Sequence, residues 1–411
     1  MAISLSGWRS VWALWLMALL LSACGGGGGG TSSTNNTTTP PAPGPVAAAA
    51  NVLTMSFERW PSTAQINAPF VSVTVCVPGT SNCQTIDHVL LDTGSFGLRL
   101  QASALSVEQS LPVVNNAAGR PVGACGQLAS GFTWGSVRRA DVQLSGESAS
   151  NLPIEIIGDT ASVYAKTPSA CSSTGGNLGA SVASLGANGI LGIGFLPQDC
   201  GTTCVTNATP GLYYACTGST CTGTTLAISS QITNPITAFA QDNNGATLVV
   251  PNVALGSNTA SLSGSLVFGV GTQTNNAISS SATVLPTDKF GYFTTVYQGT
   301  SYTSSFIDSG SNGIFFDDIS FSECSGFYCP SSTQSLTAIL KSPTGTNSRT
   351  VNFWIENIQD VPSDTVAAHV GGPSILSGTF DWGMPFFFGR TTHMVFSGSS
   401  TSQGTGPFWA Y

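Results

Sequence analysis

Residues 90–100, LLDTGSFGLRL, recur later in the chain as residues 306–316, FIDSGSNGIFF. In both copies an apolar run leads into an Asp-Thr/Ser-Gly-Ser turn, and apolar residues resume after the next glycine. A single Asp-Thr-Gly tripeptide is a weak signal, but two copies in matching apolar frames indicate an internal duplication.

The residue types in the repeat are suited to the activation of water. Glycine tolerates the tight turn that would hold each carboxylate rigidly at the end of a strand. The hydroxyls of Thr93 and Ser309 can each hydrogen-bond to the opposite turn, which would bring Asp92 and Asp308 into contact. Two carboxyls so close would share a proton, so that one can act as general base on water and the other as general acid on a peptide carbonyl.

The rest of the sequence predicts a mainly β protein. Short runs rich in Val, Thr and aromatic residues alternate with clusters of Gly, Pro, Asn and Ser, and helical periodicity is scarce. We expect residues 51–245 to form an N-terminal β lobe and residues 246–411 a C-terminal β lobe, each with one copy of the repeat. The predicted strands are 70–77, 88–92, 137–144, 248–253, 265–270, 293–297, 351–355 and 394–396.

These features resemble the pepsin-like aspartic peptidases, whose Asp-Thr/Ser-Gly-Ser/Thr motifs match residues 92–95 and 308–311. Segments 188–195, 264–269 and 383–396 resemble further family segments, in the family's order. The chain is also similar to a poorly characterised group of bacterial lipoproteins with the same two motifs. The resemblance implies a two-lobed pepsin-like acid protease fold with catalytic roles for Asp92 and Asp308. It also implies supporting roles for Thr93, Gly94, Ser95, Ser309, Gly310 and Ser311.

The chain departs from this family at two positions. Trp134 stands where the family has a tyrosine, on a hairpin flap over the cleft, so it is either a substrate-binding residue or an ordinary core residue. Asp381 replaces an apolar residue shortly before Gly383. This third carboxylate could perturb the pair or face solvent, and we favour solvent.

Residues 1–23 predict a signal peptide. Their apolar run, 11–21, is too short to cross a bilayer as a mature helix, and it ends in Leu-Ser-Ala-Cys, which resembles the bacterial lipobox. The resemblance implies cleavage before Cys24 and acylation of its thiol. Residues 24–50 have few apolar side chains and predict a flexible tether. Gly25 lacks the acidic character that, by family analogy, retains lipoproteins at the inner membrane. We therefore expect an exported protein, lipid-anchored to the bacterial envelope at the outer membrane or the periplasmic face.

The other ten cysteines predict disulfide bonds, as expected for an exported chain. Short spacings suggest four local pairs and leave one longer pair by elimination, although the sequence alone does not fix the connectivity. There is no CxxC motif and the three histidines are scattered, so we expect neither a metal nor another cofactor. The suggested pairs are Cys76–Cys83, Cys200–Cys204, Cys216–Cys221, Cys324–Cys329 and Cys125–Cys171.

The charge and the motifs of the sequence limit the classes of function that it can have. Only 11 residues are Lys or Arg and the net charge is −8, which excludes a nucleic-acid-binding surface. We interpret the one basic pair, Arg138 and Arg139, as part of a solvated strand face. The sequence therefore predicts a monomeric aspartic endopeptidase acting on peptides or proteins. Alternatives are a non-catalytic peptide- or protein-binding module of the same fold and a structural surface lipoprotein. Two retained Asp turns favour the enzyme, and the altered flap favours the binding module.

Overall fold

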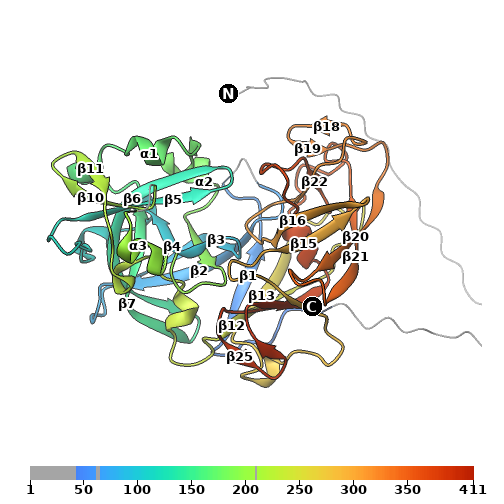
Figure 1. Cartoon of the computed structure of the whole chain (residues 1–411), viewed down its shortest axis with the longest axis horizontal. Coiled ribbons are helices and arrows are strands. Elements are labelled where there is room, and N and C mark those ends of the chain that lie inside the picture. Colours follow the sequence, from blue (N-terminus) through green and yellow to red (C-terminus); the bar gives the residue numbers. More distant parts are fainter. Residues whose placement is uncertain (1–42, 62–64, 209–210) are drawn as a thin grey trace, which may run out of the picture. The chain divides into compact units, whose positions relative to one another are not determined.

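A computed structural model of the chain describes residues 43–61, 65–208 and 211–411 (Figure 1). The predicted signal peptide, Cys24 and the tether as far as residue 42 lie outside the described residues. Within the described part, no helix is both long and apolar enough to cross a membrane.

The protein is mainly β, as the sequence predicts, and every strand predicted above overlaps an observed one. The α-helices of the described residues are single turns, α1 (Ser169–Ser172), α2 (Val182–Leu185) and α3 (Thr202–Thr206), and short 3-10 helices are also present. The strands of the N-terminal half are β1 (Val52–Phe57), β2 (Pro69–Cys76), β3 (Cys83–Asp92), β4 (Phe96–Gln101), β5 (Val122–Leu128), β6 (Gly131–Leu144), β7 (Glu147–Ile157), β8 (Gly176–Asn177), β9 (Gly189–Ile193), β10 (Tyr213–Thr217) and β11 (Thr220–Gly223).

The C-terminal half is also built from strands, several of them short. They are β12 (Gly245–Val250), β13 (Leu262–Phe268), β14 (Val284–Pro286), β15 (Phe293–Tyr297), β16 (Thr300–Ile307), β17 (Ile314–Phe315), β18 (Glu323–Cys324), β19 (Phe327–Tyr328), β20 (Gln334–Lys341), β21 (Ser348–Ile355), β22 (Gly371–Gly372), β23 (Asp381–Trp382), β24 (Arg390–Val395), β25 (Ser400–Thr401), β26 (Gly404–Thr405) and β27 (Phe408–Ala410).

The larger sheet joins strands from both halves of the chain. Strand β1 pairs antiparallel with β2 on one side and with β13 on the other, and β12 and β24 continue the sheet beyond β13. Figure 1 shows β1, β13 and β12 next to one another. A second sheet has the order β21-β20-β15-β16-β23-β17-β22. The main hydrophobic core draws on both sheets, with Leu91, Ile193, Ile307 and Trp382 among its buried members.

The strands around the two Asp turns have the same arrangement. Strand β3 ends at Asp92 and β4 follows the turn; β9 lies between them, parallel to β3 and antiparallel to β4. Strand β16 leads into Asp308 and β17 follows; β23 lies between them, parallel to β16 and antiparallel to β17. The strand after each turn also pairs in parallel with a further strand, β7 in one case and β22 in the other. The sequence repeat is therefore also a structural repeat.

All five suggested disulfides are confirmed. Four close loops of at most seven residues' separation, whereas Cys125–Cys171 spans 46 residues and ties the β5–β6 hairpin to α1.

Candidate active site

The two Asp turns are hydrogen-bonded to each other through Thr93 and Ser309. The Thr93 amide donates to the Ser309 hydroxyl (3.1 Å), and the Ser309 amide donates to the Thr93 hydroxyl (2.9 Å). Each hydroxyl then donates to a carbonyl of the strand opposite, at Ile307 (3.1 Å) and Leu91 (2.8 Å). This reciprocal set fixes the relative position of the two turns, as their sequences predict.

Asp92 accepts hydrogen bonds from the residues that follow it in its own turn. The Gly94 amide donates to it at 2.7 Å, the Ser95 amide at 3.2 Å, and the Ser95 hydroxyl binds its second oxygen. Gly94 is required by the approach of the opposite carboxyl, because a side-chain carbon there would lie 2.7 Å from Cγ of Asp308. Three donors therefore bind the two oxygens of the Asp92 carboxyl.

Asp308 has a matching but poorer set of donors. The Gly310 amide (2.8 Å) and the Ser311 hydroxyl (2.8 Å) bind it. Burial raises the pKa of Asp308 well above its ordinary value, the negative charges of Asp92 and Asp381 raise it further, and a side-chain hydrogen bond with Asp92 acts in the same direction. The structure therefore brings the two carboxyls together and favours a proton on Asp308.

The expectation that Asp381 faces solvent is wrong. Its side chain is buried, with 7% of the residue exposed, because β23 is threaded between β16 and β17. It pairs with Phe306, two residues before Asp308. Burial raises the pKa of Asp381 well above its ordinary value, the Ser311 hydroxyl lowers it, and the charge of Asp92 raises it.

Trp134 is buried and does not line the cavity, which favours the second of the two alternatives, an ordinary core residue. The indole N–H donates to the Tyr164 carbonyl (2.9 Å), and the ring packs edge-on against Tyr214. The β5–β6 hairpin is nevertheless present, and its tip, residues 127–130, lines the cavity above the Asp turns. The family resemblance put Trp134 on the flap, whereas the structure places it within strand β6 and residues 127–130 at the tip of the hairpin.

Both carboxyls line a cavity of about 630 Å³, a volume in the usual range for ligand sites. Its rim includes exposed apolar side chains: Phe290 is 51% exposed, Tyr292 40% and Leu376 44%. The rest of the lining combines polar and charged residues, among them the two Asp turns, with apolar residues that include Leu90, Phe96, Leu128, Ile190, Phe195 and Phe306.

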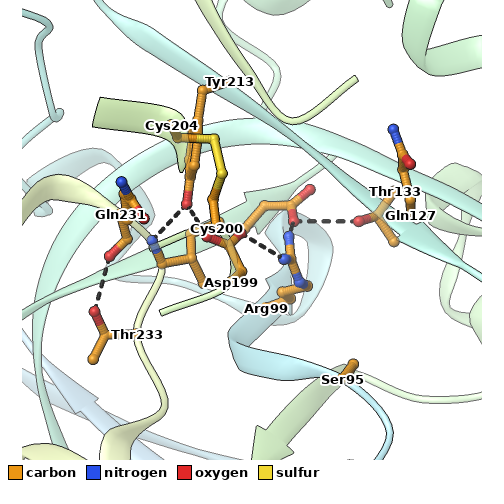
Figure 2. Close-up of polar contacts among 12 residues, drawn as sticks. Ser95, Arg99, Gln127, Thr133, Asp199, Cys200, Cys204, Tyr213, Gln231 and Thr233 are labelled. Carbon is orange, nitrogen blue, oxygen red and sulfur yellow. Dashed lines mark hydrogen bonds and ion pairs between the residues drawn. A yellow bond between two sulfur atoms is a disulfide. The ribbon is translucent and has the colours of Figure 1, made fainter. Parts of the chain in front are cut away.

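One side of the cavity holds a buried ionic network that the sequence interpretation missed. Arg99 bonds to Glu155 and to Asp199 (3.1 Å), the Thr133 hydroxyl donates to Glu155 (3.2 Å), and the Tyr213 hydroxyl donates to Asp199. Figure 2 shows Arg99 beside Asp199, with dashed contacts leading to Thr133 on one side and Tyr213 on the other. Burial by itself lowers the pKa of Arg99, but the charges of the two carboxylates raise it above its ordinary value.

A signal for this network was present in the repeat. Arg99 is a charged residue in an otherwise apolar frame, at the position where the second copy has Phe315. The interpretation of Arg138 as a solvated residue is also wrong: it is only 4% exposed and forms an ion pair with Asp159 (2.8 Å). Arg99 and Arg138 are thus both used as buried ion-pair partners in a chain that is poor in charge.

Residues 47–411 match a family described as "Protein of unknown function (DUF3443)". No curated protein matches the chain.

Proposed function

The chain belongs to the DUF3443 family, and we propose that it is an aspartic endopeptidase with a two-lobed pepsin-like fold. One observation carries the proposal: two carboxyls from duplicated turns, Asp92 buried and Asp308 half-buried, meet at one cavity, each packed against a glycine of the opposite turn. A pure binding protein has no chemical need for such a pair, because bringing two acids together costs free energy.

The different donor sets assign the two roles. Asp92, with three donors, is the base, and Asp308, whose pKa is raised, is the acid. In the proposed reaction Asp92 takes a proton from water, the hydroxide oxygen bonds to the peptide carbon, and Asp308 gives its proton to the carbonyl oxygen. In the second step the C–N bond breaks: the proton on Asp92 passes to the leaving nitrogen and one hydroxyl proton of the intermediate returns to Asp308. Water is consumed and both carboxyls regain their starting state.

The strand arrangement supports the two-lobed fold. The strands before and after each Asp turn both pair with a third strand from a distant part of the chain, β9 for the first turn and β23 for the second. The two groups of three strands have the same directions. The reciprocal bonds of Thr93 and Ser309 relate the sets by an approximate two-fold axis at the cavity. The tip of the β5–β6 hairpin reaches the cavity from the N-terminal half, as a flap would.

The lining supports a preference for apolar side chains on both sides of the scissile bond. Apolar and aromatic residues provide much of the cavity wall and three exposed residues of its rim. Burial of apolar substrate side chains there yields roughly 25 cal/mol for each Å² removed from water. Sequencing of cleavage products by mass spectrometry tests this point, and dominant cleavage beside Lys or Arg contradicts it.

The direct test uses the full-length chain in detergent with a mixed peptide library, from roughly pH 3 to pH 7, with and without pepstatin. We expect endoproteolytic products that pepstatin suppresses and that the variant Asp92→Asn does not form. A folded chain that binds peptides without cutting them at any pH in this range would instead support the binding module.

We also propose that the protein is exported and anchored through an acylated Cys24. Replacing Cys24 with Ser removes the acyl acceptor, so the variant should leave the membrane fraction and appear in the soluble fraction. A variant that still sediments with membranes contradicts the lipid anchor.

A further inference from the structure

In the structural repeat, the residue two positions before each catalytic Asp pairs with one residue of a neighbouring strand, and these two partner residues occupy equivalent positions. In the N-terminal half, Leu90 of β3 pairs with Ile190 of β9. In the C-terminal half, Phe306 of β16, which matches Leu90 in the repeat, pairs with Asp381 of β23. The residue beside one catalytic strand is therefore aliphatic, and the residue beside the other is an acid.

Asp381 is not explained by a structural role. It is more than nine-tenths buried, and its Oδ1 atom has no hydrogen-bond partner among the described residues. None of the Lys, Arg or His side chains of the described residues forms an ion pair with it. An unpartnered buried carboxyl costs roughly 1–3 kcal/mol, so an aliphatic residue, as at position 190, would be the more stable choice.

We propose, on the basis of the peptidase function above, that Asp381 is the third carboxyl of the active site and a positioning residue for the proton on Asp308. It holds its own proton while the pair is singly charged. When it ionises, its charge lies in the same buried site and prevents Asp308 from losing its proton. The site then keeps its reactive, singly protonated pair to a higher pH than two carboxyls alone would allow.

The groups that surround Asp381 agree with this role. Two other acids lie near Asp381: Asp308, at the end of strand β16, and Asp92, from the other turn. Strand β17 contributes Phe315, which does not titrate. The Ser311 hydroxyl donates to Asp308 at 2.8 Å and is also a neighbour of Asp381, so it links the two carboxyls. With only negative charges nearby, each proton lost from the site makes the next loss harder.

The test compares the wild-type protein with Asp381→Asn and Asp381→Ile, the second chosen because Ile190 occupies the equivalent position. Infrared difference spectra at pH 7 report the carbonyl band of protonated carboxyls without any need for activity. We expect each variant to lack one protonated carboxyl. We also expect the alkaline limb of the pH profile of kcat/KM to move to lower pH, by roughly one unit.

The outcomes separate this proposal from the peptidase function. An unchanged protonated-carboxyl band, or an unchanged alkaline limb in a folded variant, overturns the role of Asp381. If the wild-type protein cleaves no peptide, the peptidase function fails, while the infrared comparison still decides whether a third protonated acid is present. A loss of activity at all pH values without a shift of the limb assigns Asp381 to structure and also overturns the proposal.

Discussion

The turn at Asp92 and the turn at Asp308 share their internal hydrogen bonds but have opposite neighbours. Beside the first turn, Ile190 pairs across β9 and β4 with Arg99, a cation. Beside the second turn, Asp381 pairs across β23 and β17 with Phe315, an apolar residue. At equivalent positions, the strand after the first turn carries the cation Arg99 and the strand after the second carries the apolar Phe315. The strand between the others carries Ile190 in the first half and the acid Asp381 in the second.

This difference separates two requirements that the site must meet. The backbone turns and their reciprocal bonds bring the carboxyls together, and both halves contribute equally to that. The neighbouring strands then decide which carboxyl keeps a proton, and there the halves differ. Two carboxyls in contact share one proton in any case, and unequal surroundings fix which of them is the acid and which is the base.

The strongest test of the comparison is to remove the acid. Asp308→Asn keeps the shape of the turn but removes the proton, so peptide cleavage should fall about a thousandfold or more. Burial raises the pKa of Asp308 in the folded protein, so this carboxyl favours folding below roughly pH 4, and that benefit is lost as the pH rises. Melting curves at pH 7 should therefore show equal or higher stability for the variant. Unchanged cleavage would place the chemistry elsewhere.

The second test breaks the ionic network of the N-terminal half. Glu155→Ala leaves Arg99 with one carboxylate partner, Asp199, in a buried site, and should lower the free energy of unfolding by about 3 kcal/mol. The matched control is Phe315→Leu, at the position equivalent to Arg99, which should cost less than about 1.5 kcal/mol because it changes only apolar packing. Urea denaturation of both variants measures the difference, and equal losses would mean that the network adds nothing specific.

The third test makes the two halves alike. Asp381→Ile should raise the free energy of unfolding at pH 7 by about 1–3 kcal/mol, because a buried and partly unpartnered acid is removed. Burial raises the pKa of Asp381 in the folded state, so the part of the gain that comes from ionisation of the acid in the unfolded chain should be lost below roughly pH 4, where the acid is protonated in both states. The reverse change, Ile190→Asp, should destabilise the protein at pH 7 and much less at low pH. A gain that does not depend on pH would indicate packing alone.

The sequence was sufficient for features that depend on local pattern. The strands follow from runs of β-branched and aromatic residues, the disulfides from short cysteine spacings, and the meeting of the Asp turns from their duplication. The burial of Asp381 and Arg138 and the position of Trp134 depend on strands paired over long distances, which no local pattern reports. A charged residue is assigned to solvent by default, and that default fails where distant strands enclose it.

The smallest expected effect concerns the bonds that the two turns share. Thr93 and Ser309 differ by one methyl group, yet the hydroxyl of each accepts a hydrogen bond from one amide N–H and donates a hydrogen bond to one carbonyl. If the hydroxyls alone hold the turns together, Thr93→Ser should change the free energy of unfolding by less than about 1 kcal/mol, the value of one buried methyl group, and should leave cleavage intact. Thr93→Ala removes the hydroxyl, leaves the Ser309 amide without its acceptor, and should cost about 1–2 kcal/mol together with part of the activity. Thermal unfolding and kcat/KM of both variants decide the point. If serine at position 93 is as harmful as alanine, the methyl group holds the turn, and the two halves are less alike than their hydrogen bonds indicate.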